Sequence, residues 1–318
     1  MLGEFYKRIR ENVGTVVVGK ESLCDLMTTT MLCGGHMLLE DVPGTAKTTL
    51  AKAFAASFEG VYKRIQFTPD LLPSDITGIN YFNMKKSEFE FVPGPVFSNV
   101  LLVDEINRAT PKTQAGLLEC MEELQATVDG NTMEIKAPFM VVATQNPIES
   151  MGVFPLPEAQ LDRFLIKANM EYPTHAESAA ILKRFNGANP LSDIKPVFSL
   201  DEILEARKTL DSIFVHEDIM DYIVSLVEAT RNHSNVTLGV SPRGALALMR
   251  VSKGFAAAAD RAYVSPDDVK AAAMYVLPHR MVLSSSAKVK KNAAKEIIES
   301  ILETVAVPTE GELGWYKG

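Results

Sequence analysis

Cysteine is scarce in this chain and forms no recognisable framework. Only three occur among 318 residues, Cys24, Cys33 and Cys120. An odd count without a C-x-x-C spacing argues against a disulfide scaffold and against a zinc knuckle. Because free thiols are typical of reducing compartments, we expect a cytoplasmic protein.

Long apolar runs are also lacking. No stretch approaches the roughly 18 apolar residues of a membrane-spanning helix, so no membrane segment is expected. Residues 1–10 mix charged and apolar side chains, which is not the pattern of a signal peptide.

Positive charge is in deficit. Lysine and arginine total 32 against 40 acidic residues, a formal net charge of -8. Excess negative charge repels nucleic-acid phosphates and anionic lipid, and only Lys288, Lys290 and Lys291 cluster. We therefore expect no nucleic acid partner and no membrane surface.

Up to about residue 172, short apolar runs alternate with helical stretches. Runs that are apolar on both faces are typical of covered parallel strands, and their alternation with helices indicates βαβ units. The sequence therefore predicts an α/β domain over residues 1–172. Its five strand candidates are 37–39, 63–67, 100–103, 139–143 and 164–168.

Two hairpins are predicted within this domain. Residues 88–91 alternate at period two, and Asp129-Gly130 favours a tight turn between two short strands. Decoration of the sheet edge is the simpler alternative for both.

From residue 173 to 318 the pattern becomes helical. Ser199 and Glu202 have capping-box spacing, while Ser241 and Ser265 each precede a proline as N-caps do. This stretch is predicted to be a second, all-helical domain.

The strongest chemical signal is the stretch 40–49, E-D-V-P-G-T-A-K-T-T, between a strand and a helix. Backbone amides at a helix start bind phosphate, Lys47 would reach the outer phosphates, and Thr48 would offer its hydroxyl to Mg²⁺. The match to the G-x-x-x-x-G-K-[ST] loop is imperfect, since Asp41 and Ala46 replace its glycines. Ala46 would be tolerated at a negative φ. A capped helix after a buried strand is the alternative.

Two acids end the apolar strand at 100–103. Asp104 can hold the Mg²⁺ shell, and Glu105 can orient and deprotonate the attacking water. Alone they could equally be solubilising residues. The lysine–threonine loop some sixty residues upstream favours the catalytic interpretation.

Three further residues complete the set. Asn146 follows the strand at 139–143 and could contact the γ-phosphate or the water, although Asn-Pro also starts turns. Arg163 lies just before the last strand candidate, and it could simply form an ion pair with Asp162 or Glu158. Arg243 lies at a helix start, where the dipole disfavours a cation, so a phosphate or an acid should be near.

Together these residues resemble the MoxR family of AAA+ ATPases over about 15–280. The matching stretches are L-E-D-V-P-G at 39–44, Q-F-T-P-D-L-L-P-S-D at 66–75, D-E-I-N-R-A at 104–109, A-T-Q-N-P at 143–147, F-P-L-P-E-A-Q-L-D-R-F at 154–164 and S-P-R at 241–243. The fold that this implies is an AAA+ P-loop domain with a parallel five-stranded sheet between helices, followed by a helical lid.

The resemblance also implies roles by position. Lys47 and Thr48 are the Walker A residues, Asp104 and Glu105 the Walker B pair, Asn146 the first sensor, Arg163 the arginine finger and Arg243 the second sensor. The nucleotide is expected at Val17, Val18 and Gly19, which line the adenine site, and at the loop residues Asp41, Val42, Pro43, Gly44, Thr45, Ala46, Lys47, Thr48 and Thr49. The hairpins correspond to the helix-two and pre-sensor inserts. Leu124 departs from the family's arginine.

The implied cofactors are ATP and Mg²⁺, and the implied activity is ATP hydrolysis that remodels a client protein. Family members form rings, usually hexamers, often beside a partner with a von Willebrand factor A domain. A nucleic-acid motor and a non-hydrolysing nucleotide switch are the alternatives. The acidic charge argues against the motor, and the full set of hydrolytic residues argues against the switch.

Overall fold

The computed structural model describes residues 2–41, 46–145, 152–186, 190–290 and 292–308. The chain divides into two compact units. The sheet unit comprises Tyr6–Leu156 and Ala168–Glu205, and the helical unit comprises Met1–Phe5, Pro157–Lys167 and Ala206–Gly318. This division does not test the domain boundary predicted near residue 173, which stays a prediction.

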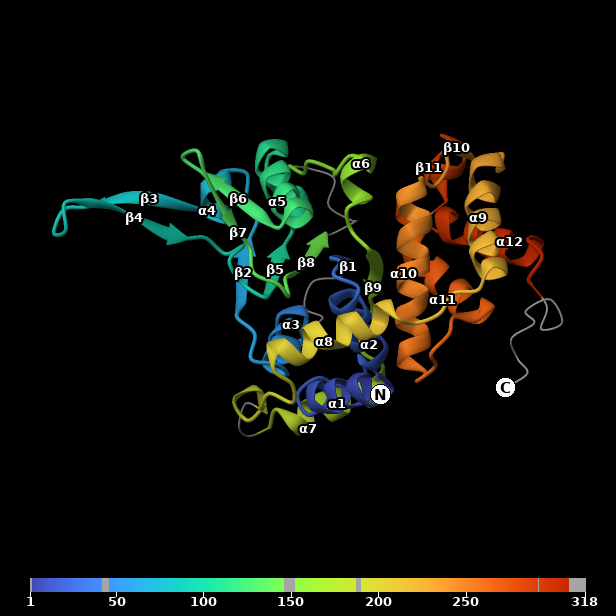
Figure 1. Cartoon of the computed structure of the whole chain (residues 1–318), viewed down its shortest axis with the longest axis horizontal. Coiled ribbons are helices and arrows are strands. Elements are labelled where there is room, and N and C mark those ends of the chain that lie inside the picture. Colours follow the sequence, from blue (N-terminus) through green and yellow to red (C-terminus); the bar gives the residue numbers. More distant parts are fainter. Residues whose placement is uncertain (1, 42–45, 146–151, 187–189, 291, 309–318) are drawn as a thin grey trace. The chain divides into compact units, whose positions relative to one another are not determined.

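A five-stranded sheet forms the centre of the sheet unit, within the part of the chain that the structure describes (Figure 1). Its order is β2-β5-β8-β1-β9, and the β2–β5, β5–β8 and β8–β1 pairs are parallel. The strands are β1 (Met37–Asp41), β2 (Tyr62–Gln66), β5 (Val100–Asp104), β8 (Met140–Gln145) and β9 (Ile166–Met170). All five strand candidates are confirmed, although β9 begins two residues later than expected.

Helices flank this sheet as predicted. Helix α3 packs on β2 and β5, and β5 is buried throughout, which explains why its sequence is apolar on both faces. The helices are α1 (Leu2–Gly14), α2 (Glu21–Leu32), α3 (Lys47–Ala56), α4 (Pro73–Thr77), α5 (Pro111–Glu123), α7 (His175–Arg184) and the start of α8 (Leu200–Asp211), with short 3₁₀ turns at Ile106–Arg108 and Pro190–Ser192.

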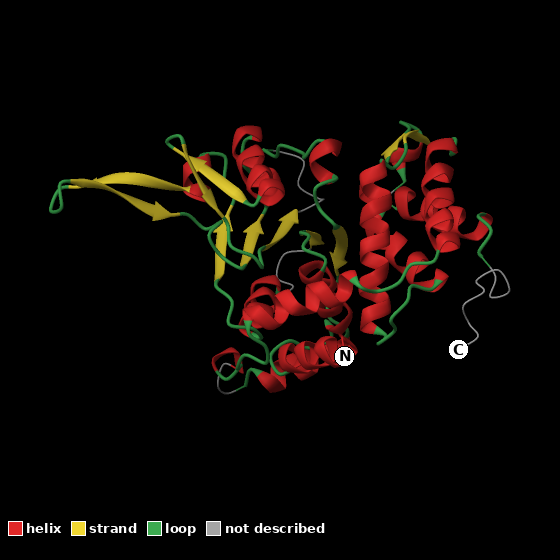
Figure 2. Ribbon diagram, in the orientation of Figure 1, coloured by secondary structure: helices red, strands yellow, loops and turns green. Residues whose placement is uncertain are grey.

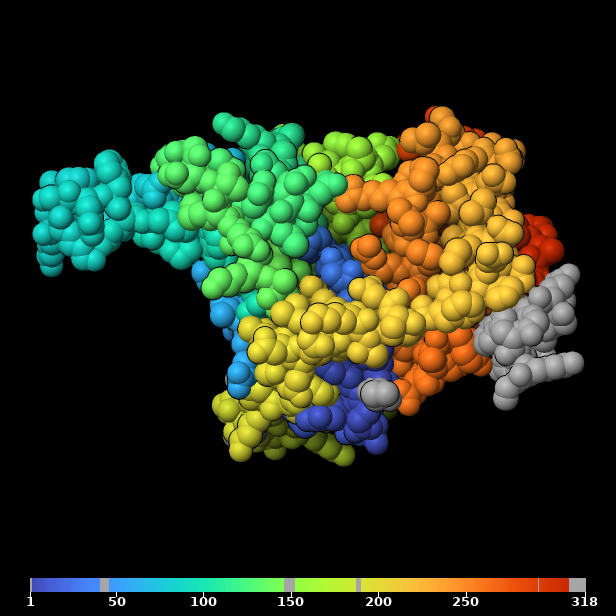
Figure 3. Space-filling model, viewed as in Figure 1, coloured from blue at the N-terminus to red at the C-terminus, as the bar shows by residue number. Residues whose placement is uncertain are grey.

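Both predicted hairpins are present, and neither extends the main sheet. Strands β3 (Gly78–Asn83) and β4 (Glu88–Pro93) form one two-stranded sheet, and β6 (Gln125–Val128) and β7 (Asn131–Glu134) form another. Asp129 and Gly130 have φ of 50° and 80°, as a type I′ turn requires. The β3–β4 hairpin projects from its unit as an arm (Figure 3).

The described residues of the helical unit are mainly helix (Figure 2). Ser241 and Ser265 accept hydrogen bonds from the first turns of their helices, so both N-caps are confirmed. The elements are α6 (Glu158–Leu161), α9 (Glu217–Asn232), α10 (Pro242–Ala258), α11 (Pro266–Val276), α12 (Ala293–Thr304), 3₁₀ turns at Pro278–Arg280 and Ala287–Val289, and a short pair of β10 (Val236–Leu238) with β11 (Val282–Leu283). That strand pair was not expected from the sequence.

The capping box predicted at the start of α8 is also present. The Ser199 amide donates to Glu202, and the Glu202 amide donates to the Ser199 hydroxyl. Among the described helices, none has the length and apolar character needed to cross a membrane.

Candidate active site

The predicted phosphate loop joins β1 to α3. Helix α3 begins at Lys47, so the amides of its first turn are available to an anion, as a phosphate site requires. Val42, Pro43, Gly44 and Thr45 lie outside the described residues, and so does the side chain of Asp41. The strand before the predicted loop and the helix after it, which carries Lys47, Thr48 and Thr49, are both present.

Ala46 differs from expectation. Its φ is +66°, in the left-handed region, whereas its tolerance at this glycine position was expected to require a negative φ. For an alanine this conformation costs about 1–2 kcal/mol relative to the right-handed region.

The predicted Walker B pair lies at the end of β5, where Asp104 is the last residue of the strand and Glu105 follows it, and the two carboxylates lie in different environments. Asp104 is buried and receives a charged hydrogen bond from Arg64 Nε to its Oδ2 at 2.6 Å. The Thr144 hydroxyl lies 3.4 Å from its Oδ1. This pairing, together with burial of the carboxylate, fits a role for Asp104 as an acid that binds a cation.

Glu105 turns away from the strand. Its φ is +56°, and its backbone amide donates to the Thr144 hydroxyl at 3.0 Å. The side chain is more exposed than that of Asp104, and its Oε2 accepts from Gln66 Nε2 at 2.8 Å and from Arg108 Nε at 3.0 Å. Two fixed donors thus orient a carboxylate that solvent can still reach, which suits a general base.

Gln66, Arg64, Arg108 and Thr144 were not singled out as site residues. Gln66, Arg108 and Thr144 lie within the stretches that carry the family resemblance, so their sequence signal was present without an assigned role. The parallel register that pairs Gln66 with Asp104 brings β2 and β5 side chains together.

The third strand end is described only in part. Gln145 of β8 donates to Glu40 of β1 at 3.0 Å, as expected for paired strands that end at the same edge. Asn146 lies outside the described residues, so its role as first sensor stays a prediction.

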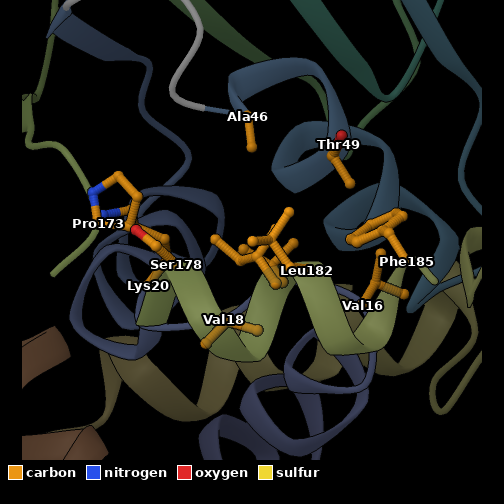
Figure 4. A pocket seen from close by; sticks show the side chains of 11 residues that line it. Val16, Val18, Lys20, Ala46, Thr49, Pro173, Ser178, Leu182 and Phe185 are labelled. Atoms are coloured by element: carbon orange, nitrogen blue, oxygen red, sulfur yellow. The ribbon is translucent and has the colours of Figure 1, made fainter. Parts of the chain in front are cut away.

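A pocket of about 360 Å³ lies beside the start of α3. Val17 and Val18, predicted for the adenine site, line it, and Ala46 and Thr49 face Leu182 of α7 and Phe185, the C-cap residue of α7, across it (Figure 4). The other lining residues are Val16, Lys20, Pro173, Ser178 and Ile181. Leu182 is 74% exposed and Phe185 is 44% exposed, so apolar surface borders a cavity large enough for a planar ring.

Gly19 does not line this pocket, but its geometry requires glycine. Its φ is +68°, and an added Cβ would lie 1.9 Å from Glu177 Oε1. Glu177 is fixed by the capping box of α7, where the Thr174 amide donates to its Oε2 at 2.6 Å. Gly19 thus lets the 16–20 segment approach α7 closely enough to form the pocket wall.

The two predicted arginines lie in the helical unit. Arg243 occupies the first turn of α10, as predicted. Asp162, one acid considered as a partner for Arg163, is paired with Arg280 Nε at 2.7 Å. The approach of either arginine to a nucleotide stays a prediction.

We expect Lys47→Ala to weaken ATP binding about ten- to a hundredfold, because one charge-assisted contact to phosphate is typically worth about 1.5–3 kcal/mol. Calorimetry measures the change. Lys52→Ala is the matched control, since this exposed lysine lies in the same helix. Unchanged ATP binding in Lys47→Ala would mean that this loop is not the site.

Leu182→Asp is expected to lower ATP affinity by roughly tenfold or more, because it places a carboxylate in an apolar wall. Stability should hardly change, since the side chain is 74% exposed. Leu238→Asp, at a 62% exposed leucine of the helical unit, should leave affinity unaltered. Equal ATP affinities for both variants would exclude this pocket as the binding site for the adenine ring.

Comparison with known proteins identifies the family. Residues 36–166 match the family described as "ATPase family associated with various cellular activities (AAA)", and residues 228–301 match the AAA lid domain. The chain is similar to YeaC of Bacillus subtilis, with 46% identity covering 94% of each chain. It is also similar to Chaperone MoxR1 of Mycobacterium tuberculosis, with 41% identity covering 93% of this chain and 80% of that protein.

Two other proteins agree with this assignment. Protein MoxR of Paracoccus denitrificans is 30% identical over 96% of this chain and 98% of its own length. A crystal structure from Cytophaga hutchinsonii superposes with a TM-score of 0.90 and 38% identity, covering 97% of both chains. The AAA domain makes this chain a nucleotide-binding, ATP-hydrolysing enzyme. On these findings the chain belongs to the MoxR family of AAA+ ATPases.

Proposed function

We propose that this ATPase uses Mg²⁺-dependent hydrolysis to remodel or mature a client protein, as part of a ring that is most simply a hexamer. The observation that supports the hydrolytic site is the arrangement at the end of β5. There the buried Asp104 pairs with the Arg64 guanidinium, and Gln66 and Arg108 orient Glu105. The relative named Chaperone MoxR1 supports the client-directed role.

The groups present fit ATP and Mg²⁺. Asp104 and Thr48 offer the hard oxygen donors that Mg²⁺ prefers. The apolar pocket beside Ala46 suits the adenine ring of an ATP whose phosphates bind the neighbouring phosphate loop. When bound, Mg²⁺ would neutralise charge on the phosphate oxygens. Lys47 and the α3 amides would hold the phosphates, and Asn146 would help position the γ-phosphate or the water.

The protein's part in the chemistry follows from these placements. Glu105 takes a proton from the attacking water. Gln66 and Arg108 hold its carboxylate in position by donating hydrogen bonds to Oε2. Arg163 of one subunit would stabilise the charge that develops on the neighbour's γ-phosphate, and Arg243 would contact phosphate from the lid. Each active site is then completed by two subunits.

A trapped complex tests the client role. Glu105→Gln should retain ATP without hydrolysing it, so affinity capture in ATP should retain a client, including any partner with a von Willebrand factor A domain. Lys47→Ala is the control, because its ATP affinity is expected to be about ten- to a hundredfold lower, so it stays largely unloaded at ATP concentrations that just saturate Glu105→Gln. Recovery of the same proteins by both variants, or of nucleic acid in place of protein, would contradict client remodelling.

A further inference from the structure

The segment that carries Arg163 belongs to the helical unit. Residues Pro157–Lys167 form one compact unit with Ala206–Gly318. In the sequence the two stretches are separated by Ala168–Glu205, which belong to the sheet unit. A short segment that joins a distant part of the chain needs specific contacts to hold it there, and one buried side chain supplies most of those that are described.

Arg280 is that side chain, and it is only 2% exposed. Its Nε pairs with Asp162 Oδ1 at 2.7 Å. Its Nη2 donates to the carbonyls of Asp162 at 3.3 Å and Phe164 at 2.6 Å, and its Nη1 donates to that of Leu165 at 3.2 Å. One guanidinium therefore holds the backbone on both sides of Arg163.

The charge of this group is retained despite burial. Burial lowers the pKa of Arg280 to about 10, while Asp162 opposes the shift, so the guanidinium stays protonated at neutral pH. Burial also lowers the pKa of the adjacent His279, and its neutral ring lies with Nε2 3.0 Å from the Phe164 carbonyl oxygen. A buried cation is tolerated because its donors are directed at the carboxylate and carbonyls of the finger segment.

The same carboxylate reaches the second predicted arginine. The Ser241 hydroxyl lies 3.3 Å from Asp162 Oδ2, and Ser241 is the N-cap of α10, two residues before Arg243. Asp162 thus lies between Arg280, the Arg163 segment and the start of the Arg243 helix.

We propose that Arg280 is a positioning residue that fixes Arg163 to the helical unit, so that the finger and the Arg243 helix move as one piece. The inference rests on the proposed roles of Arg163 and Arg243. It adds regulation to them, because a change in a subunit's lid is carried directly to the finger that serves the neighbouring site.

Hydrogen–deuterium exchange on the full-length protein tests the attachment without using activity. In Arg280→Met, peptides that cover 157–167 should exchange roughly tenfold faster or more, while α9, α10 and α11 keep their protection. Arg261→Met is the matched control, because Arg261 pairs with Asp268 at 2.5 Å in the same unit. It should leave exchange in 157–167 unchanged.

Turnover separates a positioning role from a structural one. Arg280→Met should keep its ATP affinity and lose about 10²-fold in turnover, as expected when a catalytic group is displaced by about 1 Å. Mixing it with Lys47→Ala subunits, whose fingers are intact, should restore activity in part. Mixing it with Arg163→Ala subunits should restore none.

Unchanged exchange in 157–167, or a general loss of protection in both Arg280→Met and the milder Asp162→Asn, would overturn the proposal. Recovery of activity with Arg163→Ala subunits would do the same. If Lys47→Ala and Arg163→Ala subunits fail to complement each other, the trans finger is wrong, and the exchange result still decides whether Arg280 holds the segment.

Discussion

Arg163→Ala is expected to lower ATP turnover by about 10³- to 10⁵-fold while ATP affinity stays nearly unchanged. A finger arginine stabilises charge that appears on the γ-phosphoryl oxygens only during transfer, so its loss affects the chemical step more than binding. Phosphate release and calorimetry on the same preparation measure the two quantities separately.

Arg250→Ala is the control for this variant. Arg250 is an exposed arginine of α10 in the same unit, and its loss should leave turnover at the wild-type level. If Arg163→Ala retained more than about a tenth of wild-type turnover, the range associated with an arginine finger would not be reached, and Arg163 would be a surface residue.

Glu105→Gln is expected to bind ATP normally and to hydrolyse it about 10²- to 10⁴-fold more slowly. Glutamine keeps the shape of the side chain but cannot accept the proton of the attacking water. Single-turnover phosphate release measures the loss, and equilibrium binding checks that the site still loads.

Glu59→Gln provides the comparison, since Glu59 is an exposed acid of the same unit. It should behave like the wild type. Near-normal hydrolysis by Glu105→Gln would mean that another residue is the general base, and it would remove the Walker B assignment of Glu105.

The elements that the sequence revealed are those whose cause is local. The strands at 37–39 and 100–103 are apolar on both faces because β1 and β5 lie inside a covered sheet, and that burial leaves a direct mark on composition. Caps at Ser199, Ser241 and Ser265 are equally local, because the hydroxyl and the amide it satisfies are three residues apart.

The left-handed conformation of Ala46 could not be inferred from its residue type. Alanine ordinarily favours the right-handed region, so a negative φ was the natural expectation. The observed φ of +66° occurs at the N-cap of α3, and the residue type alone does not indicate it.

Long-range partners were the other feature that the sequence did not reveal. Arg64 meets Asp104 across 40 positions, and Arg280 meets Asp162 across 118. Both pairs depend on strand register or on packing between distant segments. The α7 side chains that line the pocket beside Ala46, including Leu182, were missed for the same reason, because an exposed leucine has no distinguishing pattern until the pocket is formed.

The central claim, that each active site is completed by two subunits, is tested most directly by mixing Lys47→Ala with Arg163→Ala protein. The first variant carries the finger but binds ATP about ten- to a hundredfold more weakly, so it stays largely empty at ATP concentrations that just saturate the second. The second variant loads ATP but lacks the finger. Exchange of labelled subunits must first show that mixed rings form. The account predicts that phosphate release partly returns in these rings, whereas persistent inactivity in rings shown to be mixed would contradict it.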